Sequence, residues 1–183
     1  MACISATLAG LAQDCSQSMG GVNKVLIRPY SAGTIYFASS ADTKVKVDGL
    51  TGITGQTIEW KAYYFRKGNA QVTSTLNVDP ANGVNYVSSE LQLTFTKQET
   101  VKRVEMSALV LGDVMVVYQD SNGIWWALGV DSPVTATAGT AQTGAARTDG
   151  NNYQITLTAE DLTWPVELDE NSSAAASGVP FPA

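Results

Sequence analysis

The chain of 183 residues contains no histidine, so the commonest general base and the commonest metal ligand are both missing. Only two cysteines are present, Cys3 and Cys15, and the sequence leaves open whether they pair or stay free. A scaffold held together by disulfides needs more of them. No apolar run reaches the length of a membrane span. We therefore expect a protein that is neither disulfide-rich nor embedded in a membrane.

Sequence motifs for chemistry are also missing. The chain has no GxGxxG, no GxxxxGK[ST], no CxxC pair and no HExxH. A Ser–Lys arrangement stays open, but a serine nucleophile has no histidine to activate it. The acidic pairs Glu160–Asp161 and Asp169–Glu170 could hold a metal, although such pairs are usually solvated. We predict no catalytic, cofactor-binding or metal-binding residues, and hence a protein that is not an enzyme.

Positive charge is absent after Arg147, and this asymmetry sets the net charge of −6. All eleven basic residues lie in the first 147 positions, together with eleven of the seventeen acidic ones, so this part is neutral. The remaining six acids carry the excess: Asp149, Glu160, Asp161, Glu167, Asp169 and Glu170. A solvated acidic tail is the ordinary interpretation. An acidic end repels phosphates, so we do not expect stable DNA or RNA binding.

Apolar and polar residues alternate along much of the chain, which predicts half-buried antiparallel strands. Turn residues separate them at 79–85 ("DPANGVN") and 120–123 ("DSNG"). The clearest strands are 57–65, 71–79, 85–96 and 152–158, and weaker candidates are 22–28, 34–39 and 43–49. The sequence therefore predicts an all-β fold, mainly an antiparallel β-sandwich or barrel.

One segment has a helical period instead, and we predict a flanking helix over about 97–110. Thr96 and Glu99 have the spacing of a capping box, and Gly112 is placed to end the helix. Apolar residues recur at steps of three and four, which predicts that they form the buried face. They are Val101, Val104, Ala108 and Leu111.

These elements suggest an N-terminal arm over 1–20, a β-sandwich domain over 21–168 and a flexible C-terminal tail over 169–183. The stretch 132–152 is rich in Thr, Ala and Gly and is predicted as a long loop. Its beginning could also pair as an edge strand. Within the domain, no further division is indicated.

Two adjacent tryptophans pose a packing problem in the hairpin over 114–130, because successive strand residues point to opposite faces. We assign Trp126 to the sandwich core, with Ile124, Leu128 and Val130. Trp125 must then lie under the helix or at a contact between subunits. The opposite face of the preceding strand is also apolar. The candidate interface residues are Trp125, Met115, Val117 and Arg147.

The order of elements resembles structural proteins of tailed bacteriophages that infect Bacteroidetes, including crAss-like phages. A strand ("SSELQLTFTK") leads into a helix ("ETVKRVEMSALVLG"), a hairpin ("VMVVYQDSNGIWWALG") and then "TAGTAQTGAARTDGNNYQITLT". The opening "MACI" and the segment "GGVNKVLIRPY" fit the same pattern. The resemblance extends from about Gly20 to Leu168.

The resemblance implies a tail-tube or tail-ring protein, located in the virion tail and made in the cytoplasm of the bacterial host. Such proteins form homo-oligomeric rings that stack around a DNA channel and contact other tail or neck proteins. DNA passes through without specific binding, and Glu160 and Asp161 are candidates for an acidic lumen. The alternatives are a capsid decoration or head-fibre protein, or a carbohydrate-binding module that uses aromatic side chains.

Overall fold

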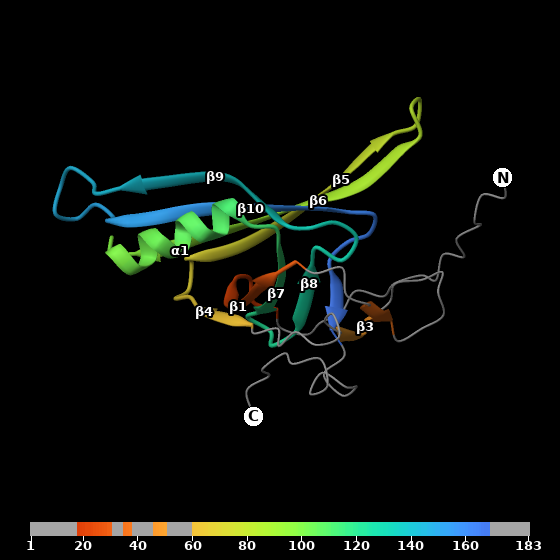
Figure 1. Ribbon diagram of the computed structural model, residues 1–183, viewed down its shortest axis with the longest axis horizontal. Helices are drawn as coiled ribbons and strands as arrows, with labels where there is room; N and C mark the ends of the chain where they lie inside the picture. The colour runs from red at the N-terminus through yellow and green to blue at the C-terminus, as the bar shows by residue number, and fades with distance from the viewer. Residues whose placement is uncertain (1–17, 31–34, 38–45, 51–59, 169–183) are drawn as a thin grey trace.

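Two β-sheets packed face to face make up the protein, with one α-helix among the residues that the structure describes (Figure 1). The computed structural model describes residues 18–30, 35–37, 46–50 and 60–168. Both predicted terminal segments, apart from residues 18–20, lie outside these ranges, as do Cys3 and Cys15. The prediction of an antiparallel sandwich with a flanking helix is confirmed.

The larger sheet has seven strands in the order β2-β3-β11-β8-β7-β1-β4. Its pairs are antiparallel except for β11 with β3. Its strands are β1 (Val22–Pro29), β2 (Ile35–Phe37), β3 (Lys46–Leu50), β4 (Lys61–Tyr64), β7 (Val114–Asp120), β8 (Trp125–Leu128) and β11 (Val166–Leu168).

The smaller sheet has four strands in the order β5-β6-β10-β9, and every pair in it is antiparallel. Its strands are β5 (Ala70–Asp79), β6 (Val84–Thr96), β9 (Thr135–Gln142) and β10 (Asn152–Asp161). The beginning of the predicted loop 132–152 is therefore an edge strand, the alternative that its composition left open.

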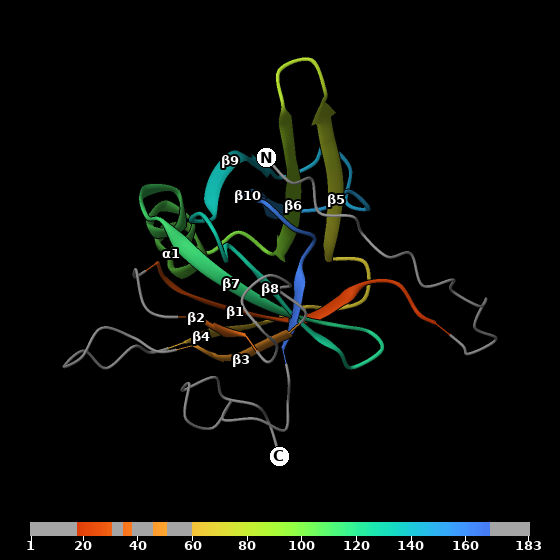
Figure 2. The same cartoon turned by 90° about the vertical axis from the view of Figure 1, so that its right-hand side faces the viewer.

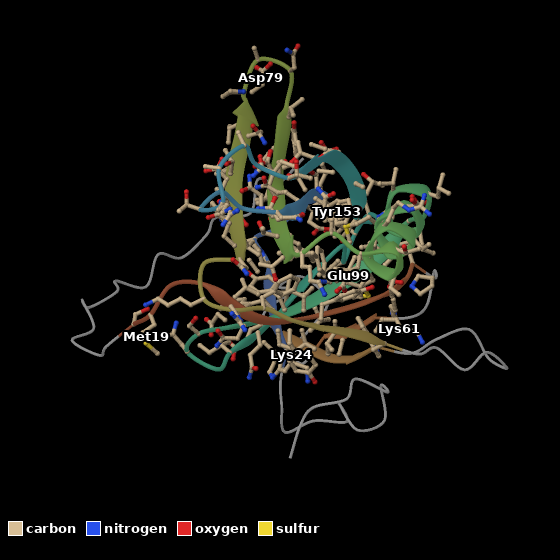
Figure 3. The ribbon with its side chains drawn as sticks, turned by 90° about the vertical axis from the view of Figure 1, so that its left-hand side faces the viewer. Met19, Lys24, Lys61, Asp79, Glu99 and Tyr153 are labelled. Atoms are coloured by element: carbon tan, nitrogen blue, oxygen red, sulfur yellow. The ribbon has the colours of Figure 1, made fainter. Side chains whose placement is uncertain are left out.

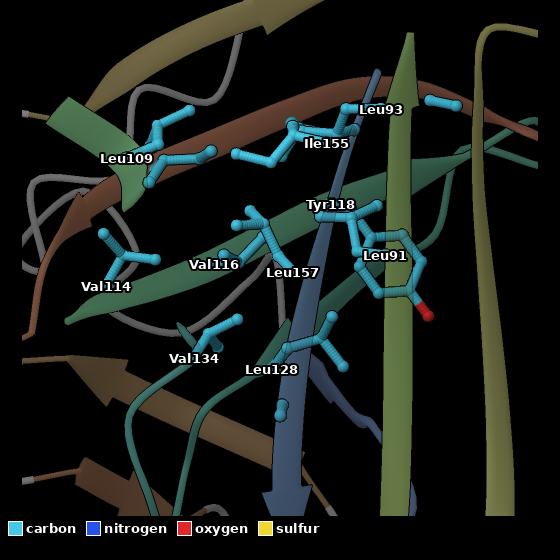
Figure 4. Close-up of a cluster of buried hydrophobic side chains, with 14 of the residues drawn as sticks. Leu91, Leu93, Leu109, Val114, Val116, Tyr118, Leu128, Val134, Ile155 and Leu157 are labelled. Carbon is cyan, nitrogen blue, oxygen red and sulfur yellow. The ribbon is translucent and has the colours of Figure 1, made fainter. Parts of the chain in front are cut away.

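The main core lies between the two sheets and follows the alternation of the sequence (Figure 4). Leu91 and Leu93 of β6 point inward, as do the alternate residues of β10. They meet the inner face of the larger sheet, where Val116, Tyr118 and Leu128 are buried. Burial of these aliphatic side chains holds the two sheets together.

Helix α1 (Thr100–Leu111) begins later than predicted, and the capping box does not form. Glu99 is itself the N-cap residue, and its carboxylate pairs with Lys97 and Lys102 instead. The chain turns sharply just before it, because Lys97 adopts a positive φ of 65°. Gly112 ends the helix with an extended backbone.

The predicted buried face of α1 is wrong. Val101 is 78% exposed and Leu111 is 88% exposed, whereas Leu109 is buried and Met106 is partly buried. The helix lies beside β9 and touches the sandwich along the line of Met106 and Leu109. Apolar residues lie on more than one side of this helix, so their spacing alone did not identify the side that packs.

The two tryptophans occupy different cores on the two faces of the larger sheet. Trp126 is half-buried and packs on the main core near Leu128, as predicted. Ile124, which was predicted beside them, is exposed in the turn, and Val130, also predicted there, is buried in the second core instead. Trp125 is only 2% exposed and belongs to a second core on the outer face of the larger sheet.

This second core lies on the face away from α1, because the helix contributes Leu109 to the main core. Trp125 is therefore not under the helix, and its burial within one chain removes it from a subunit contact. Trp60, Val130 and residues of four strands complete the second core: Leu26, Met115, Val117, Ala127, Val166 and Leu168. The larger sheet is thus apolar on both faces.

We predict that Trp125→Ala destabilises the monomer by about 3–5 kcal/mol, because it removes a large side chain from a packed core. Chemical denaturation followed by circular dichroism measures the change. Trp164→Ala, at an exposed tryptophan, is the matched control and should cost no more than about 0.5 kcal/mol. Equal effects of the two substitutions would contradict the second core.

Candidate assembly surfaces

The described residues offer surfaces for assembly and no cluster for metal chemistry. No group of three or more Cys, Asp or Glu side chains among them is arranged to hold a metal ion. No helix in the described ranges is both long and apolar enough to cross a membrane. The features that stand out belong to the smaller sheet: its outer face, its two edges, a projecting hairpin and a groove beside α1.

The outer face of the smaller sheet is polar but almost uncharged. The residues that alternate with its core positions are mainly Thr, Gln and Ser, and they bond across strands, as in Gln71–Gln92 (2.8 Å) and Thr137–Thr158 (2.8 Å). Glu90 and Glu160 carry the charges on this face, with Asp79 at its end. None of the four strands contains Lys or Arg. The face is therefore weakly acidic.

Both edges of this sheet are open, since neither β5 nor β9 has a second strand partner among the described residues. Strand β9 contains no charged residue and is exposed apart from half-buried Ala136, and β5 is uncharged until Asp79. Open edges normally carry lysine or proline, or are covered, to block pairing with other chains. These two edges lack such charges and run in opposite directions.

The hairpin of β5 and β6 extends past the rest of its sheet, as Figures 1 and 2 show. Strand β10 ends at Asp161, opposite Val87, so from that level outward the hairpin over residues 76–86 has no third strand beside it in the described structure. We call these residues the arm. Leu76 is 47% exposed and Val78 is 56% exposed, on the same face of the arm. The turn is well built, because the Asp79 carboxylate accepts hydrogen bonds from Ala81 and Asn82.

A groove of about 460 Å³ lies between α1 and the neighbouring strands β9 and β10. Small residues on β9 leave this space open, and its lining is mainly apolar. We call this surface the groove. The lining residues used below are Arg103, Met106, Val110, Leu111, Ala141 and Tyr153. Val110 and Leu111 are exposed, so this apolar surface faces solvent.

Three of the four predicted interface residues are not on the surface. Met115, Val117 and Trp125 are buried together in the second core. The prediction that this face of the hairpin is apolar is confirmed, but side chains of the same chain bury it, and no second subunit is needed. Arg147 is exposed in the connection between β9 and β10, and nothing in the structure assigns it a contact.

The two residues predicted to line the channel lumen differ in their exposure to solvent. Glu160 is exposed on the outer face of the smaller sheet. Asp161 is 5% exposed, and its carboxylate accepts hydrogen bonds from the backbone N–H groups of Gly129 (3.1 Å) and Asp131 (2.8 Å). It therefore anchors the loop after β8, and the prediction of a lumen-facing Asp161 is wrong. Strand alternation already placed it on the inner face with Ile155, Leu157 and Ala159.

Two buried cations went unpredicted on the outer face of the larger sheet. The Lys24 Nζ lies 5.5 Å from the Trp125 ring, and the Arg28 guanidinium lies 4.9 Å from the Trp60 ring. Burial lowers the pKa of Arg28 from its usual value. The sequence did contain a signal for this placement, because Lys24, Leu26 and Arg28 alternate onto one face of β1. Cation–π contacts offset part of the cost of burying these charges.

No match to known proteins was found. This holds for protein-family models, for curated proteins and for solved structures.

We predict that Asp161→Ala lowers the free energy of unfolding by at least about 2 kcal/mol, because two backbone N–H groups lose their acceptor. Glu160→Ala, one residue away and exposed, should change it by no more than about 0.5 kcal/mol. Urea denaturation of both variants gives the comparison. If both variants match the wild type, the Asp161 carboxylate is not an anchor.

Proposed function

We propose that this chain is a non-enzymatic structural protein of a bacteriophage virion. Its copies form stacked rings of the tail tube, or of the tail or neck, around the DNA channel. The observation that carries the proposal is the smaller sheet, whose two open edges are free of blocking charge and run antiparallel to each other.

The edges explain how a ring would form. When β9 of one copy lies beside β5 of the next, the antiparallel order continues across the boundary. The two partners use different edges, so the contact is heterologous and closes into a ring at a suitable rotation. Closure leaves no free edge on this sheet, which removes the risk of uncontrolled pairing.

The outer face of the smaller sheet suits a channel lining. Its Thr and Gln side chains are already hydrogen-bonded to one another in places, and its charges in the body of the sheet are Glu90 and Glu160. A face without Lys or Arg repels DNA phosphates weakly and gives them no cation to bind. DNA would pass along it without specific contacts. This agrees with the resemblance to tail-tube and tail-ring proteins, whose other partners would be tail or neck proteins.

Electron microscopy of the purified chain tests the proposal, with rings or stacked tubes as the expected result. The double variant Ala138→Lys and Thr140→Lys should abolish them, because it places two charges on the exposed β9 edge. The control is Leu162→Lys with Trp164→Lys, which adds the same charge at exposed positions outside the four strands. Circular dichroism checks that all variants stay folded.

A chain that stays monomeric at high concentration, and in the presence of its partner ring proteins, would contradict the ring proposal. A capsid decoration or head-fibre protein would instead bind heads and would not stack. A carbohydrate-binding module could not use Trp60 and Trp125, which are buried, but Tyr64 is exposed, and a glycan array tests this alternative.

A further inference from the structure

The arm and the groove lie at opposite ends of the smaller sheet. Val78 in the arm pairs with Asn85 of β6, whereas Tyr153 in the groove pairs with Phe95 of the same strand. Ten residues of strand separate these positions, which corresponds to about 34 Å. Figure 3 shows Asp79 at the tip of the arm, well away from Tyr153. The arm of a chain therefore cannot reach the groove of the same chain.

Both surfaces are apolar where they face solvent. In the arm, Leu76 and Val78 point to one side, following the inner face of the hairpin outward from the core. In the groove, the exposed side chains of Val110 and Leu111 form one wall together with Met106. A narrow hairpin that is apolar on one face matches an open apolar groove between a helix and a strand.

The charges of the two surfaces are also complementary. From Ala70 to Thr96 the chain contains no Lys or Arg, so the whole hairpin is free of positive charge. Asp79 is partly exposed at its tip, where hydrogen bonds, chiefly from Asn82, hold the pKa of its carboxyl below the usual value. Arg103 is exposed at the groove. An acidic arm tip and a basic groove residue favour contact in one orientation.

We propose that the arm of one copy docks in the groove of another copy, with Leu76 and Val78 against the apolar lining. In this contact Asp79 lies near Arg103. Because a copy has its arm at one end and its groove at the other, the contact repeats head to tail.

This inference rests on the proposed function and deepens it. Pairing of β5 with β9 runs sideways and builds the ring. Docking of the arm runs along the strand direction, so it joins one ring to the next. The two contacts use different residues and can fail separately.

Disulfide trapping tests the docking in the full chain, in a background with Cys3→Ser and Cys15→Ser. The pair Val78→Cys and Leu111→Cys in one chain should give a ladder of disulfide-linked oligomers after mild oxidation, read on a non-reducing gel. Val78→Cys alone should give nothing larger than a dimer. Val78→Cys with Val101→Cys, on the exposed side of the same helix but outside the groove, should give no ladder.

A second variant needs no cross-link. Leu76→Ser with Val78→Ser should leave single rings intact but reduce stacked tubes at least tenfold in electron micrographs. Its control is Thr73→Ser with Thr75→Ser, on the opposite face of β5.

Absence of a ladder, or an equal ladder from the Val101→Cys control, would overturn the docking. In that outcome wild-type rings and tubes would still form, and the proposed function would stand. If the wild type forms no rings at all, the proposed function fails, whatever the cross-links show.

Discussion

The structure depends on one constraint, which is that successive strand residues point to opposite sides of a sheet. In the larger sheet both sets are apolar, so both faces must be covered: Tyr118 and Trp126 face the main core, and Met115 and Trp125 face the second core. In the smaller sheet only one set is mainly apolar, and the other set is mainly Thr, Gln and Ser. The two sheets therefore have different roles. The larger is interior to the chain, and the smaller presents a surface.

The surface of the smaller sheet has the properties that assembly requires. Its edges carry no blocking charge, its hairpin extends past its neighbours, and its outer face has no basic residue. An isolated sheet with such edges tends to pair with other chains, so the chain needs a partner for them. In the proposed assembly, a ring of identical copies supplies that partner, and the polar face lines the channel. The proposal thus assigns both the contacts between copies and the channel lining to this one sheet, whose four strands contain no Lys or Arg.

The sequence predicted the strands, which follow from the two-residue period. It did not predict which elements pack against which apolar faces. Strands β5, β6 and β10 and their turns follow from alternation and turn residues. The buried side of α1 did not follow, because apolar residues lie on several sides of the helix and only contact with β9 selects Met106 and Leu109. Trp125 was predicted under the helix or at a subunit contact, and both alternatives were wrong because a second core within the chain was not foreseen. Asp161 was predicted on the surface because it is charged, although strand alternation places it on the inner face. Its hydrogen-bond partners Gly129 and Asp131 are about 30 residues away in sequence, so the sequence did not reveal them.

Hydrogen–deuterium exchange across a range of protein concentrations tests the central claim most directly, because it reports on the backbone groups of the edges. The amides of β5 and β9 should become protected as the chain assembles, whereas those of the central strands β6 and β10 should be protected at every concentration. Fast exchange of both edges in assembled material would contradict the claim that these strands join the copies.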